Sequence, residues 1–127
     1  MLNEAIELVK EFMIRAEQPV SSKPVSLGKE RVKIRASWLQ EEINEFMNAK
    51  DVYDQTDSIM DLIYYAFGTL VELGIKPDEL FMMLHEKNLL KANNLITDNC
   101  GKVLKPSDWK HPDNEIHAII DKQLNSQ

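Results

Sequence analysis

The chain has 127 residues, enough for one domain, and its composition, 43% hydrophobic and 28% charged, is that of an ordinary globular protein. A net charge of −6 disfavours sequence-independent binding to nucleic acid or to an anionic membrane. No apolar run approaches the ~18 residues of a membrane span, so we expect a soluble protein made without a signal peptide. The single cysteine, Cys100, permits no internal disulfide and favours a reducing, cytoplasmic location.

The first predicted helix covers residues 2–17, where apolar residues recur at helical spacing and Asn3 is a candidate N-cap. The following segment, residues 18–28, contains two prolines, three serines and a glycine, which break helices. It is predicted to be a connecting loop.

The second predicted helix, residues 29–50, carries one apolar stripe that we expect to pack inward. The stripe consists of Val32, Ala36, Leu39, Ile43 and Phe46. A break near residues 51–54 precedes a third helix, in which residues 59–73 are apolar around nearly the whole circumference. Such a helix is predicted to be buried on most sides, by its own bundle or by a second subunit.

Gly74 and Pro77 indicate the end of the third helix and the start of a fourth, which runs to about residue 93. Turn residues then dominate, with a possible short hairpin around residues 99–101, before a last short helix over residues 113–124. The sequence therefore predicts a single all-α domain over residues 1–127, a compact bundle of four main helices and a short C-terminal one.

Three carboxylates of the second helix, Glu41, Glu42 and Glu45, fall within roughly one quadrant at ~100° per residue, beside the apolar stripe. Like charges at this spacing repel one another unless a cation lies between them. The alternative is a solvated acidic face. Trp38 lies on the same side, where it could stack on a nucleobase or serve as a core or dimer-contact residue.

The third helix adds Asp57 and Asp61, which share a face at i and i+4. Asp61 is embedded among apolar residues and is hard to solvate, so it needs an ion-pair partner or a metal ion. A structural salt bridge is therefore the alternative. Two adjacent helices that both present acids would form an oxygen-rich site suited to Mg²⁺ or Mn²⁺.

The sequence lacks the residues that other kinds of catalytic centre require. Zinc is disfavoured because the three histidines have no ligand spacing with the single cysteine, and no Glu-x-x-His pair supports a di-iron bundle. The phosphate loop GxxxxGK[ST] and the GxSxG nucleophile motif are also absent. Hard cations such as Mg²⁺ and Mn²⁺ are therefore the remaining candidates for a metal site.

The fourth helix contains the pattern His85-x-x-Asn88-x-x-Lys91, with Lys87 and Asn94 nearby. Such a polar face could donate hydrogen bonds to phosphate oxygens. The alternative is an ordinary exposed basic patch.

The motifs EEINEF at residues 41–46 and DSIMDLIYYAFGT at residues 57–69 resemble those of the all-α nucleoside triphosphate pyrophosphohydrolases of the MazG type. Within that group, the chain is most similar to phosphoribosyl-ATP pyrophosphohydrolase-like proteins, and the resemblance extends to QPV at 18–20 and GKVLKP at 101–106. The usual second motif is Glu-x-x-Asp, but Ser58 occupies its glutamate position. Asp57 is the available substitute, which leaves the number of metal ions open.

The resemblance implies a helical bundle that forms dimers or tetramers and cleaves a nucleoside triphosphate between its α and β phosphates, giving a nucleoside monophosphate and pyrophosphate. Its role would be the removal of non-standard nucleotides or deoxynucleotides. The implied metal ligands are Glu42, Glu45 and Asp61, with Asp57 as a supporting ligand and Glu41 as a ligand or water-activating base. The implied substrate contacts are Lys87, Asn88 and Lys91 for phosphate and Gln18 and Trp38 for the base.

Two alternatives stay open at this point. The substrate could instead be phosphoribosyl-ATP or a modified deoxynucleotide such as dUTP. The protein could also be a non-catalytic helical dimer that has lost turnover, for which Ser58 is the only hint in the sequence.

Overall fold

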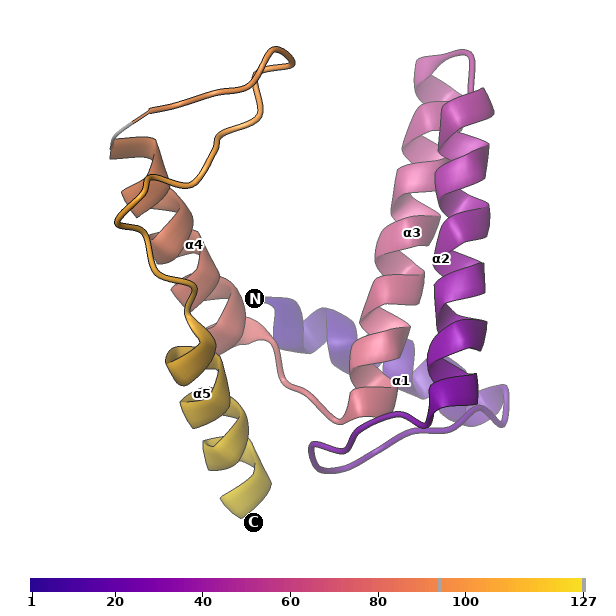
Figure 1. Ribbon diagram of the computed structural model, residues 1–127. Helices are drawn as coiled ribbons and strands as arrows, with labels where there is room; N and C mark the ends of the chain where they lie inside the picture. Colours follow the sequence, from indigo (N-terminus) through magenta and orange to yellow (C-terminus); the bar gives the residue numbers. More distant parts are fainter. Residues whose placement is uncertain (94, 127) are drawn as a thin grey trace. The chain divides into compact units, whose positions relative to one another are not determined.

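The computed structural model describes residues 1–93 and 95–126, and these form five helices (Figure 1). The helices are α1 (Leu2–Arg15), α2 (Lys29–Asn48), α3 (Val52–Leu73), α4 (Asp78–Asn93) and α5 (Asp113–Asn125). The predicted all-α fold is confirmed. The chain divides into two compact units, the first spanning Met1–Lys76 and the second beginning at Pro77, and the prediction of one domain over residues 1–127 stays a prediction. None of the described helices is both long and apolar enough to cross a membrane.

The core of the first unit lies where α1 packs against the C-terminal half of α3. The buried members of this core are Ile6, Val9, Met13 and Val71, with Val20, Phe67 and Leu70 packed against them. The loop between α1 and α2 is tied to the same end of α3, because the backbone N–H groups of Ser21 and Val25 donate to carbonyl oxygens of α3. The N-terminal helix and its loop therefore fix the lower end of the α2–α3 pair in Figure 1.

Two helix starts differ from those predicted. The predicted break between the second and third helices is present, but it covers residues 49–51 rather than 51–54, because the carboxylate of Asp51 accepts the backbone N–H of Asp54 at 2.9 Å and α3 begins at Val52. The predicted cap at Asn3 is also wrong, since α1 already begins at Leu2. Both errors lie within the uncertainty of reading helix ends from sequence.

The predicted end of α3 at Gly74 is confirmed. Gly74 has φ 71°, in the left-handed region, and a Cβ atom there would lie 2.1 Å from the carbonyl oxygen of Lys23. Only glycine tolerates both the conformation and the close approach of the neighbouring backbone.

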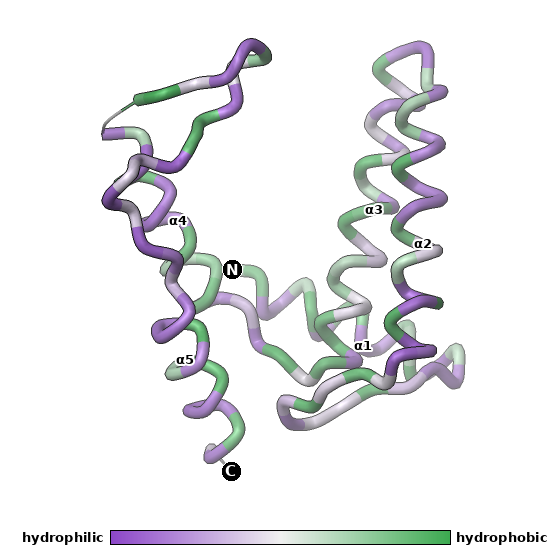
Figure 2. Tube along the Cα trace, viewed as in Figure 1, coloured by the Kyte–Doolittle hydropathy of each residue, from purple (hydrophilic) through white to green (hydrophobic). Residues whose placement is uncertain are grey.

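The face that α2 turns toward α3 is polar, contrary to the prediction. Its buried residues are Arg35 and Glu42, whereas Val32, Ala36, Ile43 and Phe46 of the predicted inward stripe are exposed. Figure 2 shows hydrophobic positions recurring along both α2 and α3 between hydrophilic ones. Arg35, which pairs with Glu72 of α3, and Glu42 occupy the contact face, so most of the apolar stripe is left outside it and Leu39 is half-buried.

The apolar circumference of α3 is likewise only partly covered within the chain. Its exposed large apolar residues are Val52, Tyr53, Ile59, Met60, Ile63 and Tyr64. The first unit alone therefore does not bury this helix on most sides. Its burial by the chain's own bundle or by a second subunit stays a prediction.

A buried ion pair joins α2 to the C-terminal half of α3. The carboxylate of Glu72, 2% exposed, accepts hydrogen bonds from the Arg31 guanidinium at 2.7 and 2.8 Å and a further one from the Nε of Arg35. Burial alone would raise the pKa of Glu72, but the hydrogen bonds from the two arginines outweigh it and the pKa is lowered. The ionised form is thus the stable one in the folded chain.

The second unit pairs α4 with α5 and with the segment between them. The Lys122 ammonium lies 2.7 Å from the Glu79 carboxylate, and the Trp109 indole N–H donates to the carbonyl oxygen of Lys87 at 3.3 Å. Before this, Thr97 and Val103 form an isolated antiparallel bridge. The short hairpin predicted around residues 99–101 is confirmed.

The ion pair of Glu72 generates a stability prediction. Glu72→Gln leaves two arginines without their charge partner, and we expect it to lower the free energy of unfolding by about 3–5 kcal/mol, measured by urea denaturation. Glu11→Gln is the matched control, because Glu11 pairs with Arg15 at 2.9 Å in full solvent and should cost less than about 1 kcal/mol. Equal losses in the two variants would contradict the assigned role.

Candidate active site

The antiparallel packing of α2 and α3 brings three carboxylates together. One oxygen from each of Glu42, Glu45 and Asp61 lies within 4.8 Å of the others. Glu42 and Glu45 are neighbours on α2, and Asp61 comes from the facing side of α3. The predicted convergence of acids from two helices is therefore present in the structure.

Glu42 is the buried member of this group. Its side chain is 7% exposed, and its Oε2 atom is buried without a hydrogen-bond partner among the described residues. The pKa of Glu42 is raised to about 7, chiefly by desolvation on burial and further by the nearby carboxylates of Glu45, Asp61 and Asp57. Such a group is stabilised by a proton or by a metal ion.

Asp61 differs from its expected environment. The sequence predicted that Asp61 is hard to solvate, but its side chain is exposed, because the apolar residues around it on α3 are themselves largely exposed. The argument from burial is thus wrong for Asp61 and applies instead to Glu42. The helical spacing of the acids, in contrast, correctly predicted that Glu42 and Asp61 belong to the same group.

The other two predicted acids lie outside the group of three. Asp57 is exposed, and its charge contributes to the raised pKa of Glu42. Glu41 is also exposed. Adjacent residues of a helix point about 100° apart, so Glu41 points away from the contact with α3 that buries Glu42. Ser58 is buried, and its hydroxyl donates to the carbonyl oxygen of Asp54 at 3.0 Å.

The chemistry of the donor set fits a hard divalent cation. All three candidate ligands are carboxylates, which suit Mg²⁺ and Mn²⁺ rather than zinc or copper. The buried oxygen of Glu42 lacks a hydrogen-bond partner and would gain one favourable contact from such an ion.

The Trp38 ring already contacts other side chains of the same chain. The guanidinium groups of Arg31 and Arg35 lie 5.1 and 4.8 Å from the Trp38 ring centre, and the Tyr65 ring lies 5.8 Å away. Trp38 thus contacts the same arginines that bind Glu72. These contacts favour the structural alternative for Trp38 over stacking on a base.

Gln18 lines a small cavity apart from the three carboxylates. This cavity, of about 90 Å³, is also bounded by Arg35, Tyr65 and Gly68. The predicted base-contacting residues Gln18 and Trp38 therefore both lie near Arg35, and the cavity does not reach the acids.

The predicted phosphate-contacting residues Lys87, Asn88 and Lys91 all lie on α4, in the second unit. The Lys87 ammonium is 3.5 Å from the Glu115 carboxylate, and the Lys91 ammonium is 5.1 Å from the Trp109 ring centre. Asn88 is exposed, and Asn94 lies outside the described residues.

The sequence reasoning missed the pairing of Glu72 with Arg31 and Arg35. The signal was present: Glu72 stands in the apolar run Leu70–Leu73, and an acid in that position needs a partner. The same argument was made for Asp61 and would have identified Glu72 correctly.

A protein-family profile matches the part of the chain that contains α2 and α3. A family profile described as phosphoribosyl-ATP pyrophosphohydrolase matches residues 9–88, more than half of the chain. The matched range contains α2, α3 and all three carboxylates of the group. A comparison with curated proteins found no match.

The raised pKa of Glu42 predicts a pH dependence of stability in the metal-free protein. Glu42 retains its proton up to about pH 7 when folded, against an ordinary value of 4.5, so the folded state binds more protons between these values. Stability should therefore fall as pH rises from about 4.5 to about 7. Glu42→Gln should abolish this fall and raise Tm at pH 8 in EDTA by roughly 4 °C, measured by scanning calorimetry.

Glu30→Gln is the matched control for this measurement, because Glu30 lies on the same helix and is exposed. It should leave the pH dependence of Tm unchanged. Parallel curves for wild type and Glu42→Gln would show that Glu42 does not carry the effect.

Proposed function

The chain belongs to the phosphoribosyl-ATP pyrophosphohydrolase family, which consists of hydrolases that act on phosphorus anhydrides, and we propose that it is a Mg²⁺-dependent nucleoside triphosphate pyrophosphohydrolase. It cleaves between the α and β phosphates and releases a nucleoside monophosphate and pyrophosphate. Its substrates are non-standard nucleotides or deoxynucleotides.

One observation carries this proposal. Glu42 presents a buried oxygen without a hydrogen-bond partner to a group in which Glu45 and Asp61 lie within 4.8 Å. Three carboxylates held this close repel one another, and a divalent cation relieves the repulsion. Such a cation also makes a protein of net charge −6 able to accept a polyphosphate.

In this proposal Glu42, Glu45 and Asp61 hold Mg²⁺, with Mn²⁺ as a substitute and Asp57 as a supporting ligand. The bound cation neutralises phosphate charge and lowers the pKa of the attacking water. Glu41, exposed beside the group, acts as a further ligand or accepts the proton of that water. Ser58 has no carboxylate to replace the glutamate of the second family motif, and its hydroxyl donates to its own helix.

We assign phosphate contacts to Lys87, Asn88 and Lys91 on the basis of their charge and their spacing along α4. Ammonium and amide groups of this kind stabilise negative charge that builds up on phosphate oxygens in the transition state. Gln18 and Trp38 are assigned to the base, and the contacts of Trp38 with two arginines make it the weaker of the two candidates.

Phosphoribosyl-ATP is the second candidate substrate, because the matched family profile carries that name. Its cleavage is the same reaction at the same bond, so the carboxylates keep their roles. A deoxynucleotide such as dUTP is a further candidate, and comparison of these substrates in one assay discriminates between them.

We further propose that the protein acts as a homodimer or a tetramer of such dimers in the cytoplasm. Apolar side chains of α2 and α3 that a single chain leaves in water support this, among them Met47, Met60 and Tyr64, which are 75%, 56% and 43% exposed. Large apolar side chains in water are stabilised when a protein–protein interface buries them.

The activity prediction concerns pyrophosphate release. Purified protein with Mg²⁺ should release pyrophosphate, not orthophosphate, from at least one of a panel of standard nucleotides, modified nucleotides and phosphoribosyl-ATP. Glu45→Gln and Asp61→Asn should each lower kcat/KM at least about 100-fold, because each removes a charge that holds the cation. Glu30→Gln, on the exposed side of α2, is the control and should stay within about twofold of wild type.

Absence of pyrophosphate release from the whole panel, or full activity in Asp61→Asn, would refute the proposal. Calorimetric titration with Mg²⁺ separates an inactive scaffold from an enzyme with an untested substrate. An enzyme should bind Mg²⁺ and lose this binding in Glu45→Ala. A scaffold should show no Mg²⁺ binding that depends on Glu45.

The oligomer prediction is tested by light scattering at micromolar concentration. Wild type should have the mass of two or four chains of 14.7 kDa. Ile63→Glu, which places a charge on the exposed apolar face of α3, should shift the mass toward one chain, whereas Val25→Glu in the α1–α2 loop should not. A monomeric wild type would exclude the dimer.

A further inference from the structure

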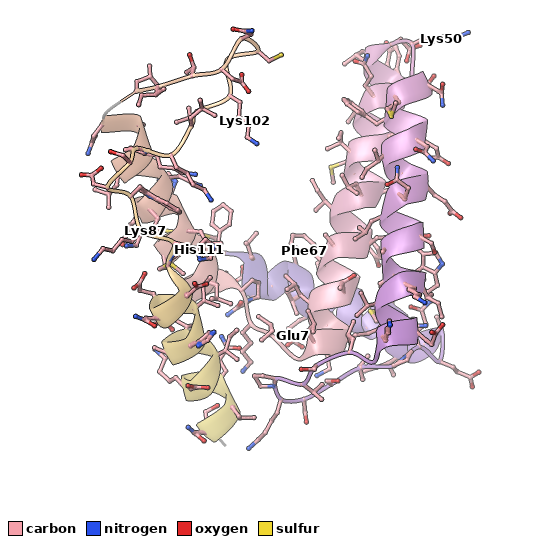
Figure 3. The ribbon with its side chains drawn as sticks, in the orientation of Figure 1. Glu7, Lys50, Phe67, Lys87, Lys102 and His111 are labelled. Carbon is pink, nitrogen blue, oxygen red and sulfur yellow. The ribbon has the colours of Figure 1, made fainter. Side chains whose placement is uncertain are left out.

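A small cavity in the first unit is bordered by the charged end of a buried arginine, Arg35. It lies at the level of α3 where Phe67, labelled in Figure 3, packs against the core. Its volume is about 90 Å³. A cavity of ~150 Å³ holds a benzene ring, so this one takes a smaller ligand. Of the described residues that line it, none is acidic, and Arg35 alone is charged.

The terminal edge of the Arg35 guanidinium faces this cavity. Its Nη2 atom is 3.9 Å from the sulfur of Met13, and a Cβ atom on Gly68 would lie 3.0 Å from Nη1 and 3.4 Å from Nη2. Met13 and Gly68 both line the cavity. A thioether sulfur is only a weak acceptor, so the terminal edge has no strong hydrogen-bond partner among the described residues.

The ion pair with Glu72 does not use up the charge of Arg35. Glu72 already accepts two hydrogen bonds from Arg31, so one carboxylate serves two guanidinium groups and the cluster keeps one positive charge. Water reaches the Arg31 side chain, which is 26% exposed, whereas that of Arg35 is 4% exposed. A buried guanidinium edge without a partner is costly, and an anion in the cavity removes this cost.

The donor edge and the walls of the cavity together favour a carboxylate over other anions. The two parallel N–H groups at the end of a guanidinium match the two oxygens of a carboxylate. The other walls are mainly apolar and include Val9, Phe12 and the ring of Tyr65. Such walls suit a short hydrocarbon part, and they supply no second cation for a dianion.

We propose that this cavity is a binding site for a small monocarboxylate of the size of acetate. The two carboxylate oxygens accept hydrogen bonds from Nη1 and Nη2 of Arg35, and the carbon end of the ligand contacts the apolar walls. The site needs neither the metal ion nor the nucleotide of the proposed function, so failure of either proposal leaves the other standing.

The test is a titration of the full chain with sodium acetate in EDTA, with sodium chloride exchanged for acetate at constant ionic strength. Saturation-transfer NMR on the acetate methyl group should give a saturable signal. Tm should rise with acetate concentration, as expected for a ligand that binds only the folded chain.

Gly68→Ala should weaken acetate binding at least about tenfold. The added methyl group would lie 3.0 Å from Nη1 and occupy the space in front of the guanidinium edge. Gly28→Ala is the matched control, because no atom lies within 4 Å of a Cβ atom there. It should bind acetate like wild type.

Arg35→Lys is a second variant, which keeps a positive charge beside Glu72 but removes the pair of parallel donors. It should also weaken acetate binding at least about tenfold. Arg15→Lys is its control, because Arg15 is exposed and pairs with Glu11 at 2.9 Å. Circular dichroism should show that each variant retains the helix content of wild type, and the ligand comparison on wild type keeps the test valid if a variant does not fold.

Three outcomes would overturn the inference. The first is an absence of saturable acetate binding in wild type, and the second is equal binding by wild type and by folded Gly68→Ala or Arg35→Lys. The third is competition on wild type: equal affinity for chloride would make the cavity an unselective halide site. Displacement of acetate by uridine or adenosine would likewise assign the cavity, which Gln18 also lines, to the nucleobase.

Discussion

The ion pair between Glu72 and its two arginines determines how α2 lies against α3. Its partners are 41 and 37 residues apart in the sequence, and they meet only in one register of the two helices. Because Arg31 and Arg35 are one helical turn apart, a slip by one turn would leave the buried carboxylate with one arginine instead of two. The same register sets the distance from Glu42 to Asp61, so the structural ion pair fixes the geometry of the candidate metal site.

The polar contact between α2 and α3 limits where the apolar core of the first unit can form. With Arg35 and Glu42 buried between α2 and α3, little apolar area is removed from water there, and the core is confined to α1 and the end of α3. Apolar side chains such as Ile43, Phe46 and Ile63 then remain outside the pair. The surface that stabilises this fold is therefore divided between the chain and its proposed partner subunit.

Spacing along single helices predicted more of this structure than burial did. Glu42, Glu45 and Asp61 were found because i, i+3 and i, i+4 periodicities are properties of one helix, and Gly74 was found because its conformation is local. The inward stripe at Val32 and Ile43 was wrong because the partner of α2 is selected by charges on α3, which no window of local sequence contains. The expected burial of Asp61 failed for the same reason: its apolar neighbours on α3 are left uncovered by the first unit.

Glu42 combines two requirements that oppose each other in the absence of metal. Burial against α3 favours the neutral form, with a pKa of about 7, whereas coordination of a cation requires the carboxylate. In the proposed function, a proton and Mg²⁺ would compete for the same oxygen near neutral pH, and metal binding would release the proton. The carboxylates would repel a polyanion until the cation is bound, and the charge of the substrate would then favour the metal-loaded form. The buried position of Glu42, costly for folding, would in this way couple the binding of metal to the binding of phosphate.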